Sequence, residues 1–212
     1  MTKQIRIECN LSHIKERDKL KSIIAGTVKT RQENIKDFRI LKRSIDARGE
    51  KINYNLNIEY SLDGNINRKT ENKFRKKNVS NSKEVLIAGM GPAGIFAALK
   101  LIENGLKPVI IEKGKPVEER KQDISAIHRN SELNENSNYS FGEGGAGTYS
   151  DGKLYTRSKK KGNSEYVINT LNMFGASDDI LINSRPHIGS DKLPIIIKDI
   201  RAAIIECGGE IH

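Results

Sequence analysis

The stretch from residue 84 to residue 112, EVLIAGMGPAGIFAALKLIENGLKPVIIE, constrains the fold of this chain more than any other part. Residues 85–88 form a short apolar run, which is typical of a buried parallel strand. The GxGxxG sequence at 89–94 follows, and strong helix formers then lead to Gly105, where a glycine would end the helix. A second apolar run ends in Glu112. The pattern predicts a strand, a glycine turn, a helix, a strand and an acidic residue.

Each part of this pattern suits the binding of a dinucleotide. Gly89 permits the tight turn, Gly91 lets a pyrophosphate approach the backbone, and Gly94 allows helix and strand to pack closely. The helix N-terminus presents free N–H groups and a partial positive charge to the phosphates. Glu112 lies 23 positions after Gly89. This is close to the roughly 20 positions expected for a carboxylate that binds a ribose hydroxyl. An acidic residue there favours FAD or NAD over NADP.

The distribution of charge divides the chain into two parts. The 212 residues carry a net charge of +10. Residues 1–83 hold 21 basic and 10 acidic side chains, whereas residues 84–212 hold 16 and 17. A polar stretch at 80–83 marks the boundary. We therefore expect a small basic α/β domain at 1–80 and a nucleotide-binding domain over 84–212.

The N-terminal part predicts a β-α-β-β unit with a helix on one side of a sheet. Residues 3–9 alternate as a strand does, and Ser12 is placed to cap a helix over 14–26. Further strands are expected at 38–41 and 51–60. The last of these alternates cleanly, and its apolar face would consist of Ile52, Tyr54, Leu56, Ile58 and Tyr60.

The region after Glu112 departs from a plain dinucleotide-binding domain, which would soon supply another apolar strand. Helices are expected at 117–127, 164–174 and 191–206. The chain then turns and begins a strand at 210–212.

A second glycine-rich tract, FGEGGAGTYSDGKL at 141–154, has five glycines in fourteen positions. Such density is typical of backbone that lies against a ligand with its N–H groups free to donate. The alternative is a surface loop, because glycine tracts are also common there.

These tracts together resemble the bacterial FAD-dependent dehydrogenases of unassigned substrate, within the glutathione-reductase-like flavoprotein superfamily. The resemblance rests on GMGPAG, on EKG at 112–114 and on the 141–154 tract. It also rests on SIDAR at 44–48, ENSNYSFGEGG at 135–145 and RPHIGSD at 185–191. It implies a small α/β domain before a Rossmann-like FAD-binding domain, with FAD as cofactor, oxidoreduction as the activity and NAD(P)H as a candidate reductant.

The resemblance also implies which residues hold FAD, with the 141–154 tract near the pyrophosphate and the flavin ring. The candidates are Gly89, Gly91, Pro92, Ala93, Gly94, Glu112, Lys113, Arg120, Gly144, Gly145, Gly147, Thr148, Ser150 and Asp151. Lys113 and Arg120 would neutralise phosphates, or else are solvated charges. The catalytic candidate is Lys153, whose ammonium would stabilise an anionic reduced flavin. The alternative for Lys153 is a solvated side chain in an Asp-Gly turn.

Two features depart from this family. Met90 occupies a position that is usually small, although its side chain can point away from the phosphates. The family's chains are also much longer, and include later flavin-domain strands and a substrate domain. We therefore expect an N-terminal fragment with an incomplete FAD-binding domain, and the substrate cannot be predicted from it.

Two other classes of function compete with this interpretation. One is the NAD-binding domain of a dehydrogenase. The other is a polyanion- or RNA-binding module, suggested by the basic N-terminal part. Few aromatic residues accompany that charge, so base stacking is poorly supported and nucleic acid is not the favoured partner.

Several patterns that would indicate other chemistry are missing from the sequence. Cys9 and Cys207 are isolated, which favours a reducing cytoplasm and no metal site. No apolar run approaches the roughly 18 residues of a membrane span. The N-terminus also lacks the apolar core of a signal peptide.

Overall fold

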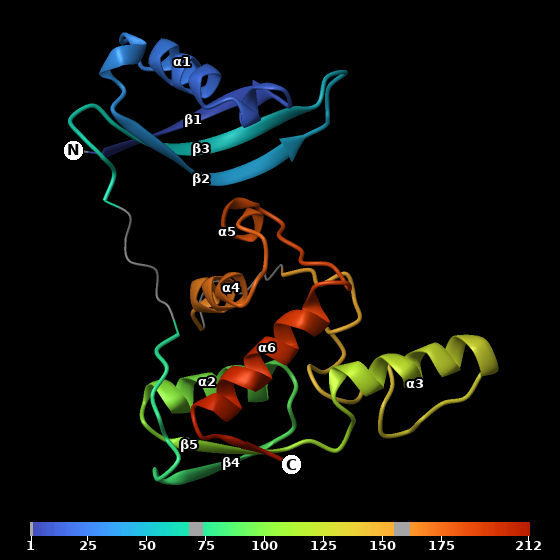
Figure 1. Ribbon diagram of the computed structural model, residues 1–212. Helices are drawn as coiled ribbons and strands as arrows, with labels where there is room; N and C mark the ends of the chain where they lie inside the picture. The colour runs from blue at the N-terminus through green and yellow to red at the C-terminus, as the bar shows by residue number, and fades with distance from the viewer. Residues whose placement is uncertain (1, 68–73, 155–161) are drawn as a thin grey trace. The chain divides into compact units, whose positions relative to one another are not determined.

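The computed structural model describes residues 2–67, 74–154 and 162–212, which form a mixed α/β protein with one antiparallel and one parallel sheet (Figure 1). Contacts divide the chain into two compact units. The first unit contains residues 1–71 and 178–186, and the second unit contains residues 72–177 and 187–212.

This division differs from the prediction in two ways. The boundary lies before residues 80–83, and residues 178–186 belong to the first unit although 84–212 was predicted to be one domain. Val79 explains part of the difference, since it is fully buried and its N–H donates to the Cys207 carbonyl at 2.7 Å. The polar stretch that looks like a linker therefore follows residues that already belong to the second unit.

The first unit has the predicted β-α-β-β order. Strands β1 (Thr2–Asn10), β2 (Asp37–Asp46) and β3 (Asn53–Ser61) form a sheet with the order β1-β3-β2, in which both pairings are antiparallel. Helix α1 (Arg17–Thr27) covers one face of the sheet (Figure 1). The core between them consists of Ile7, Cys9, Leu20, Ile24, Ala25, Ile35, Phe38, Leu56, Ile58 and Tyr60.

The start of the first helix differs from its prediction. Ser12 does not cap a helix, because its hydroxyl donates to the Asn10 side-chain oxygen at 2.7 Å. That oxygen also accepts the His13 N–H at 3.2 Å, so Asn10 holds a short 3₁₀ turn, His13–Lys15, ahead of α1. A second 3₁₀ turn, Gln32–Asn34, precedes β2.

Two strand predictions also need correction. Strand β2 continues five residues past the predicted end at 41, with a register shift, typical of a β-bulge, between Ile40 and Lys42. Ile52 does not join the apolar face of β3, since it precedes the strand and is exposed.

A distant segment completes the first unit. Residues 178–186 include the short helix α5 (Asp179–Ile182), which was not predicted from the sequence. The Ser184 N–H donates to the Arg43 carbonyl at 2.8 Å, and the Arg43 side chain donates to Asn183 and pairs with Asp179. This segment therefore lies against the outer edge of β2.

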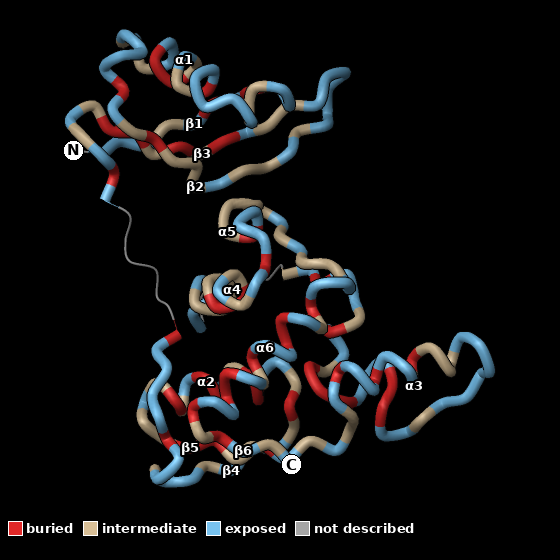
Figure 2. The backbone as a smooth tube through the Cα atoms, viewed as in Figure 1, coloured by how far each residue is buried: buried red, intermediate tan, exposed pale blue. Residues whose placement is uncertain are grey.

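The second unit is built on a parallel sheet with the order β4-β5-β6. Its strands are β4 (Glu84–Ala88), β5 (Lys107–Ile111) and β6 (Glu210–Ile211). Helices α2 (Pro92–Glu103) and α6 (Leu193–Glu206) lie on the same side of these strands (Figure 1). Buried residues concentrate where these helices meet the sheet (Figure 2). The predicted strand, glycine turn, helix and strand are all present.

Two further helices complete the second unit. Helix α3 (Val117–Asn130) runs three residues beyond its predicted end and stops at Ser131, which has a left-handed conformation with φ 58°. Helix α4 (Ser164–Met173) begins at Asn163, whose side-chain oxygen accepts the Tyr166 N–H at 3.0 Å. Among the described residues, no helix has both the length and the apolar character needed to cross a membrane.

The other face of the parallel sheet is open. Leu86 is 66% exposed and Ile111 is 52% exposed, and the register places both on the side away from α2. Parallel sheets are normally covered on both faces, so this apolar face is unusual.

Candidate functional site

The turn between β4 and α2 is fixed through the backbone of Met90. Its N–H donates to the Glu112 carboxylate at 2.6 Å, and its carbonyl accepts the Gly144 N–H at 2.8 Å. The position of Met90 usually holds a small residue in the family that the sequence resembles. The Met90 side chain is buried, so it does not occupy the outer surface of the turn. Three segments that are distant in sequence therefore meet at one residue.

Glu112 lies directly after β5 and beside this turn. Its second carboxylate oxygen accepts the Gly114 N–H at 2.8 Å, which fixes the orientation of the side chain. The residue is only partly buried, and each carboxylate oxygen can accept more than one hydrogen bond. The structure thus brings the predicted acidic residue to the glycine turn with acceptor capacity remaining.

The three turn glycines have different roles. Gly89 has φ +89°, a conformation that favours glycine. A Cβ on Gly94 would lie 2.0 Å from the Gly89 carbonyl oxygen, so the helix packs too closely on the turn for any side chain. A Cβ on Gly91 would meet nothing within 4 Å, which leaves open space at the start of α2.

That open space lies at a helix N-terminus without a side-chain cap. Gly91 is the N-cap residue and Pro92 begins the helix, while Pro92 and Ala93 are both exposed. An uncapped N-terminus keeps backbone donors and a partial positive charge for an external group. The local geometry is therefore suited to an anion.

The second glycine tract packs against this turn. A Cβ on Gly145 would lie 3.0 Å from the Pro92 side chain and 3.4 Å from the Gly91 Cα. Gly144, with φ +81°, has no room for a side chain because Thr148 Oγ1 would lie 2.1 Å from its Cβ. By contrast, Gly147 is exposed and a Cβ there would meet nothing within 4 Å. Two glycine-rich segments thus share one surface.

Arg120 holds the second tract from the inside. Its side chain is fully buried in α3, and its guanidinium donates to five backbone carbonyls. They belong to Asn138, Tyr139, Gly142, Glu143 and Gly145. Burial lowers the pKa of Arg120. This geometry fits neither expectation for Arg120, a phosphate contact or a solvated charge, because the guanidinium is directed at the loop backbone and has no exposed surface.

Glu143 is the second anchor of the tract, and sequence reasoning missed it. One carboxylate oxygen accepts the Val117 N–H at 2.7 Å at the start of α3 and pairs with Arg201 at 2.9 Å. The other oxygen is buried and has no hydrogen-bond partner among the described residues. Burial raises the pKa of Glu143, although the Val117 N–H and Arg201 act in the opposite direction. The sequence signal that could have indicated this role is the position of an acidic residue between two glycines, Gly142 and Gly144.

The remaining candidates of the tract are engaged locally. Thr148 is buried, and its hydroxyl donates to the Glu143 carbonyl at 3.4 Å. The Ser150 hydroxyl donates to the Gly147 carbonyl at 2.7 Å. Lys113 is exposed, at the same end of β5 as Glu112. The surface around the turn that can meet a ligand therefore consists of residues 91–93, 112–113 and 145–147.

Lys153 is exposed and pairs with Asp151 at 2.9 Å. Its backbone forms an antiparallel bridge with His187, and the Gly152 carbonyl accepts the Ile188 N–H at 3.1 Å. The end of the glycine tract is therefore tied to the segment before α6.

Comparison with known proteins gives two similarities. Residues 1–61 match a family described as "Domain of unknown function (DUF8436)", which corresponds to β1 through β3. An uncharacterized protein of Clostridium beijerinckii is 36% identical over 218 residues. The alignment covers 96% of this chain and 41% of the relative, so the chain spans well under half the length of the protein it matches. Neither similarity assigns an activity.

Proposed function

We propose that the second unit is a Rossmann-like FAD-binding module, the N-terminal part of an FAD-dependent oxidoreductase. The observation that carries this proposal is the packing of Gly144 and Gly145 against Met90, Gly91 and Pro92. A plain NAD-binding domain needs only the first glycine turn. A second tract fixed against that turn provides additional backbone for a longer cofactor.

The residues present fit an FAD molecule. The open space at Gly91 and the uncapped start of α2 would receive the pyrophosphate. Glu112 would accept hydrogen bonds from the ribose of the adenosine half, and the exposed Lys113 would add positive charge nearby. Residues 145–147 would also contact the pyrophosphate, because Gly145 packs beside Gly91 and Pro92 and Gly147 faces open space.

In this proposal the flavin, when bound, would accept a hydride or an electron pair from a donor, for which NAD(P)H is the candidate, and would pass it to an acceptor. The chain's own residues bind and orient the cofactor. Arg120 and Glu143 act as positioning residues because their buried side chains hold the backbone of the glycine tract in place.

The test is cofactor binding by Gly91→Val. The Gly91 backbone has φ −77°, which any residue adopts, and a Cβ would meet nothing, so the variant should fold. A branched side chain would occupy the space for the pyrophosphate, and we expect flavin binding to fall by at least about a hundredfold. Gly49→Val is the matched control, because it lies in the first unit with equal open space.

The protein is denatured after reconstitution with FAD or NAD, and the released nucleotide is identified by chromatography. Stoichiometric FAD in the parent and in Gly49→Val, with none in Gly91→Val, supports the proposal. Release of NAD alone from the parent would favour the NAD-binding alternative. Equal flavin in both variants would show that the ligand does not lie on this turn.

A further inference from the structure

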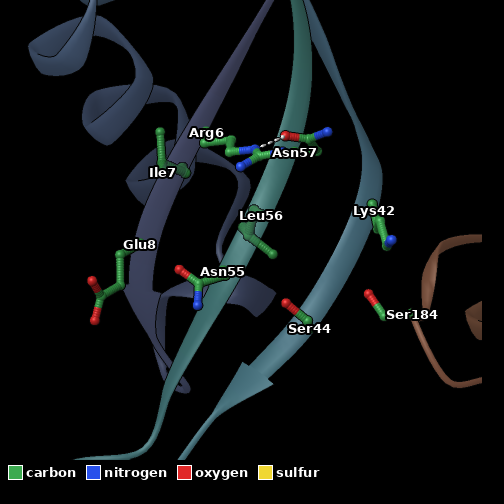
Figure 3. Close-up of a pocket in the computed structure, with 9 residues that line it drawn as sticks. All are labelled: Arg6, Ile7, Glu8, Lys42, Ser44, Asn55, Leu56, Asn57 and Ser184. Atoms are coloured by element: carbon green, nitrogen blue, oxygen red, sulfur yellow. Dashed lines mark hydrogen bonds between the residues drawn. The ribbon is translucent and has the colours of Figure 1, made fainter.

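The first unit contains a cavity of about 570 Å³ that takes no part in the proposed flavin site. It lies on the face of the antiparallel sheet opposite α1, since Ile7 and Leu56 belong to the core and their neighbours in each strand alternate outward. Figure 3 shows polar side chains from all three strands, together with Ser184 from the returning segment. Its volume falls within the range of small-molecule sites.

Three donors form one row across the sheet. The register places Arg6 and Lys42 on either side of Asn57. Arg6 Nε donates to the Asn57 side-chain oxygen at 3.3 Å, so the amide N–H₂ of Asn57 is left as the donor toward the cavity (Figure 3). Because neighbouring strands are about 4.8 Å apart, long side chains on the outer two strands can close on one anion over the middle strand.

The two cations of this row lack carboxylate partners, unlike other arginines of the same sheet. Arg39 pairs with Glu59 at 2.6 Å and Arg43 pairs with Asp179 at 2.9 Å. Among the described residues, no ion pair includes Arg6 or Lys42. The positive charge of Arg6 and Lys42, which are both exposed at the cavity, is therefore not engaged in an ion pair with a carboxylate.

The adjacent row offers mostly acceptors. It contains Glu8 and Asn55, a pair in the register, and Ser184 lies at its far end (Figure 3). The Glu8 carboxylate accepts the Asn53 amide at 2.5 Å, and it keeps further acceptor capacity. Residues of this kind bind hydroxyl groups. The lining residues include no aromatic side chain, so the cavity offers no platform for stacking a base.

We propose that this cavity binds a small phosphorylated polyhydroxy compound, of the sugar phosphate class. The phosphate lies between Arg6 and Lys42 over the Asn57 amide, and the hydroxyl groups donate to Glu8 and accept from or donate to the amide of Asn55. A bare anion satisfies only the first row, and an uncharged sugar satisfies only the second.

The test is a titration of the isotope-labelled full chain, followed by the amide chemical shifts of residues 6, 42, 55 and 57. The probes are glucose 6-phosphate, inorganic phosphate and glucose at fixed ionic strength. We expect saturable shifts, with glucose 6-phosphate binding about tenfold more tightly than inorganic phosphate and glucose more weakly than either.

Two variants locate the site. Arg6→Gln and Lys42→Gln should each weaken glucose 6-phosphate binding about tenfold, since each loses one charge-assisted contact. Lys21→Gln, on α1 at the opposite face, makes the same change in net charge and should leave the affinity within about twofold. Gly91→Val should also leave it unchanged, which separates this cavity from the flavin site.

Several outcomes would overturn the proposal. One is equal affinity for glucose 6-phosphate and inorganic phosphate, and another is an equal loss in Lys21→Gln. Shifts spread over many surface lysines would indicate nonspecific charge. Single-stranded RNA could bind more tightly than glucose 6-phosphate, with an affinity that falls equally in Arg6→Gln, Lys42→Gln and Lys21→Gln. That result would show a delocalised surface for polyanions instead.

Discussion

Glu112 shows how one side chain can serve both the fold and a ligand. Its carboxylate accepts N–H groups from Met90 in the turn and from Gly114 after the strand. Each oxygen retains a further acceptor position, which a ribose hydroxyl would use. A substitution by alanine would therefore disturb the turn and the proposed ligand together. An amide keeps the size of the side chain and one acceptor oxygen, so it retains one of the two backbone N–H contacts and loses the other.

We expect Glu112→Gln to fold and to weaken FAD binding by about 1–3 kcal/mol, because it loses charge-assisted hydrogen bonds to the ribose. Titration of the variant with FAD, followed by flavin fluorescence, measures the change. Glu119→Gln, which is exposed on α3, is the matched control. An unchanged affinity in Glu112→Gln would remove Glu112 from the proposed site.

The spacing of residues in the sequence predicted that Glu112 would lie beside the glycine turn. No spacing in the sequence predicted that Arg120 would be buried against the glycine tract. The distance between a glycine turn and the end of the next strand is set by one helix, so 23 positions are enough to bring Glu112 to the turn. A single arginine on a polar helix carries no comparable signal. Its burial depends on carbonyls that lie 18 to 25 residues away and belong to an irregular segment.

The glycine tract behaves as one element although it contains little regular structure. Arg120 gathers its carbonyls, and Glu143 attaches it to the start of α3 and to Arg201 on α6. The Glu143 carboxylate is nearly inaccessible to water, and burial raises its pKa above the ordinary value of 4.5. The stability of this element should therefore depend on pH.

The sign follows from the raised pKa. Protonation of Glu143 is easier in the folded chain, so its contribution to stability is fully present below pH 4.5 and is lost as pH rises through the folded pKa. We expect the difference in unfolding free energy between the parent and Glu143→Gln to move in favour of the variant between about pH 4.5 and pH 7.5. Urea unfolding at both values measures it, and most other titrating groups cancel in the difference. A difference that is constant, or that moves toward the parent, contradicts this assignment.

At the element scale, local patterns predicted most strands and helices of both units. Alternation and apolar runs depend on neighbouring residues, so β1, β3, β4 and β5 could be read directly from the sequence. The role of residues 178–186 could not, because their contacts with Arg43 join positions about 140 residues apart. Helix α5 has only four residues, which is too short for a periodic signal.

For the whole molecule, the open face of the parallel sheet is the feature with the largest physical consequence. Leu86, Ala88, Val109 and Ile111 share this face, and β4 is an edge strand. Contiguous apolar surface beside an unpaired strand edge promotes association between molecules. The antiparallel sheet of the first unit instead carries polar residues on its outer face.

We expect the 212-residue chain to self-associate through this face, and its second-unit strands to exchange amide hydrogens faster than β1 and β3. Leu86→Lys should lower the concentration dependence of the mass measured by sedimentation velocity. Ile45→Lys is the control, because Ile45 is equally exposed at 65% but belongs to the first unit. A strictly monomeric parent, or uniformly slow exchange through β4 and β5, would contradict this expectation.

The return of residues 178–186 to the first unit bears on how such a unit could be inherited. The recognisable domain ends at residue 61, yet the outer edge of β2 is covered by a segment encoded more than a hundred codons later. A recombination event that moved only the first 61 codons would transfer a sheet with a bare edge at Arg43. A host protein that receives this domain would therefore need another segment to contact the strand edge at Arg43.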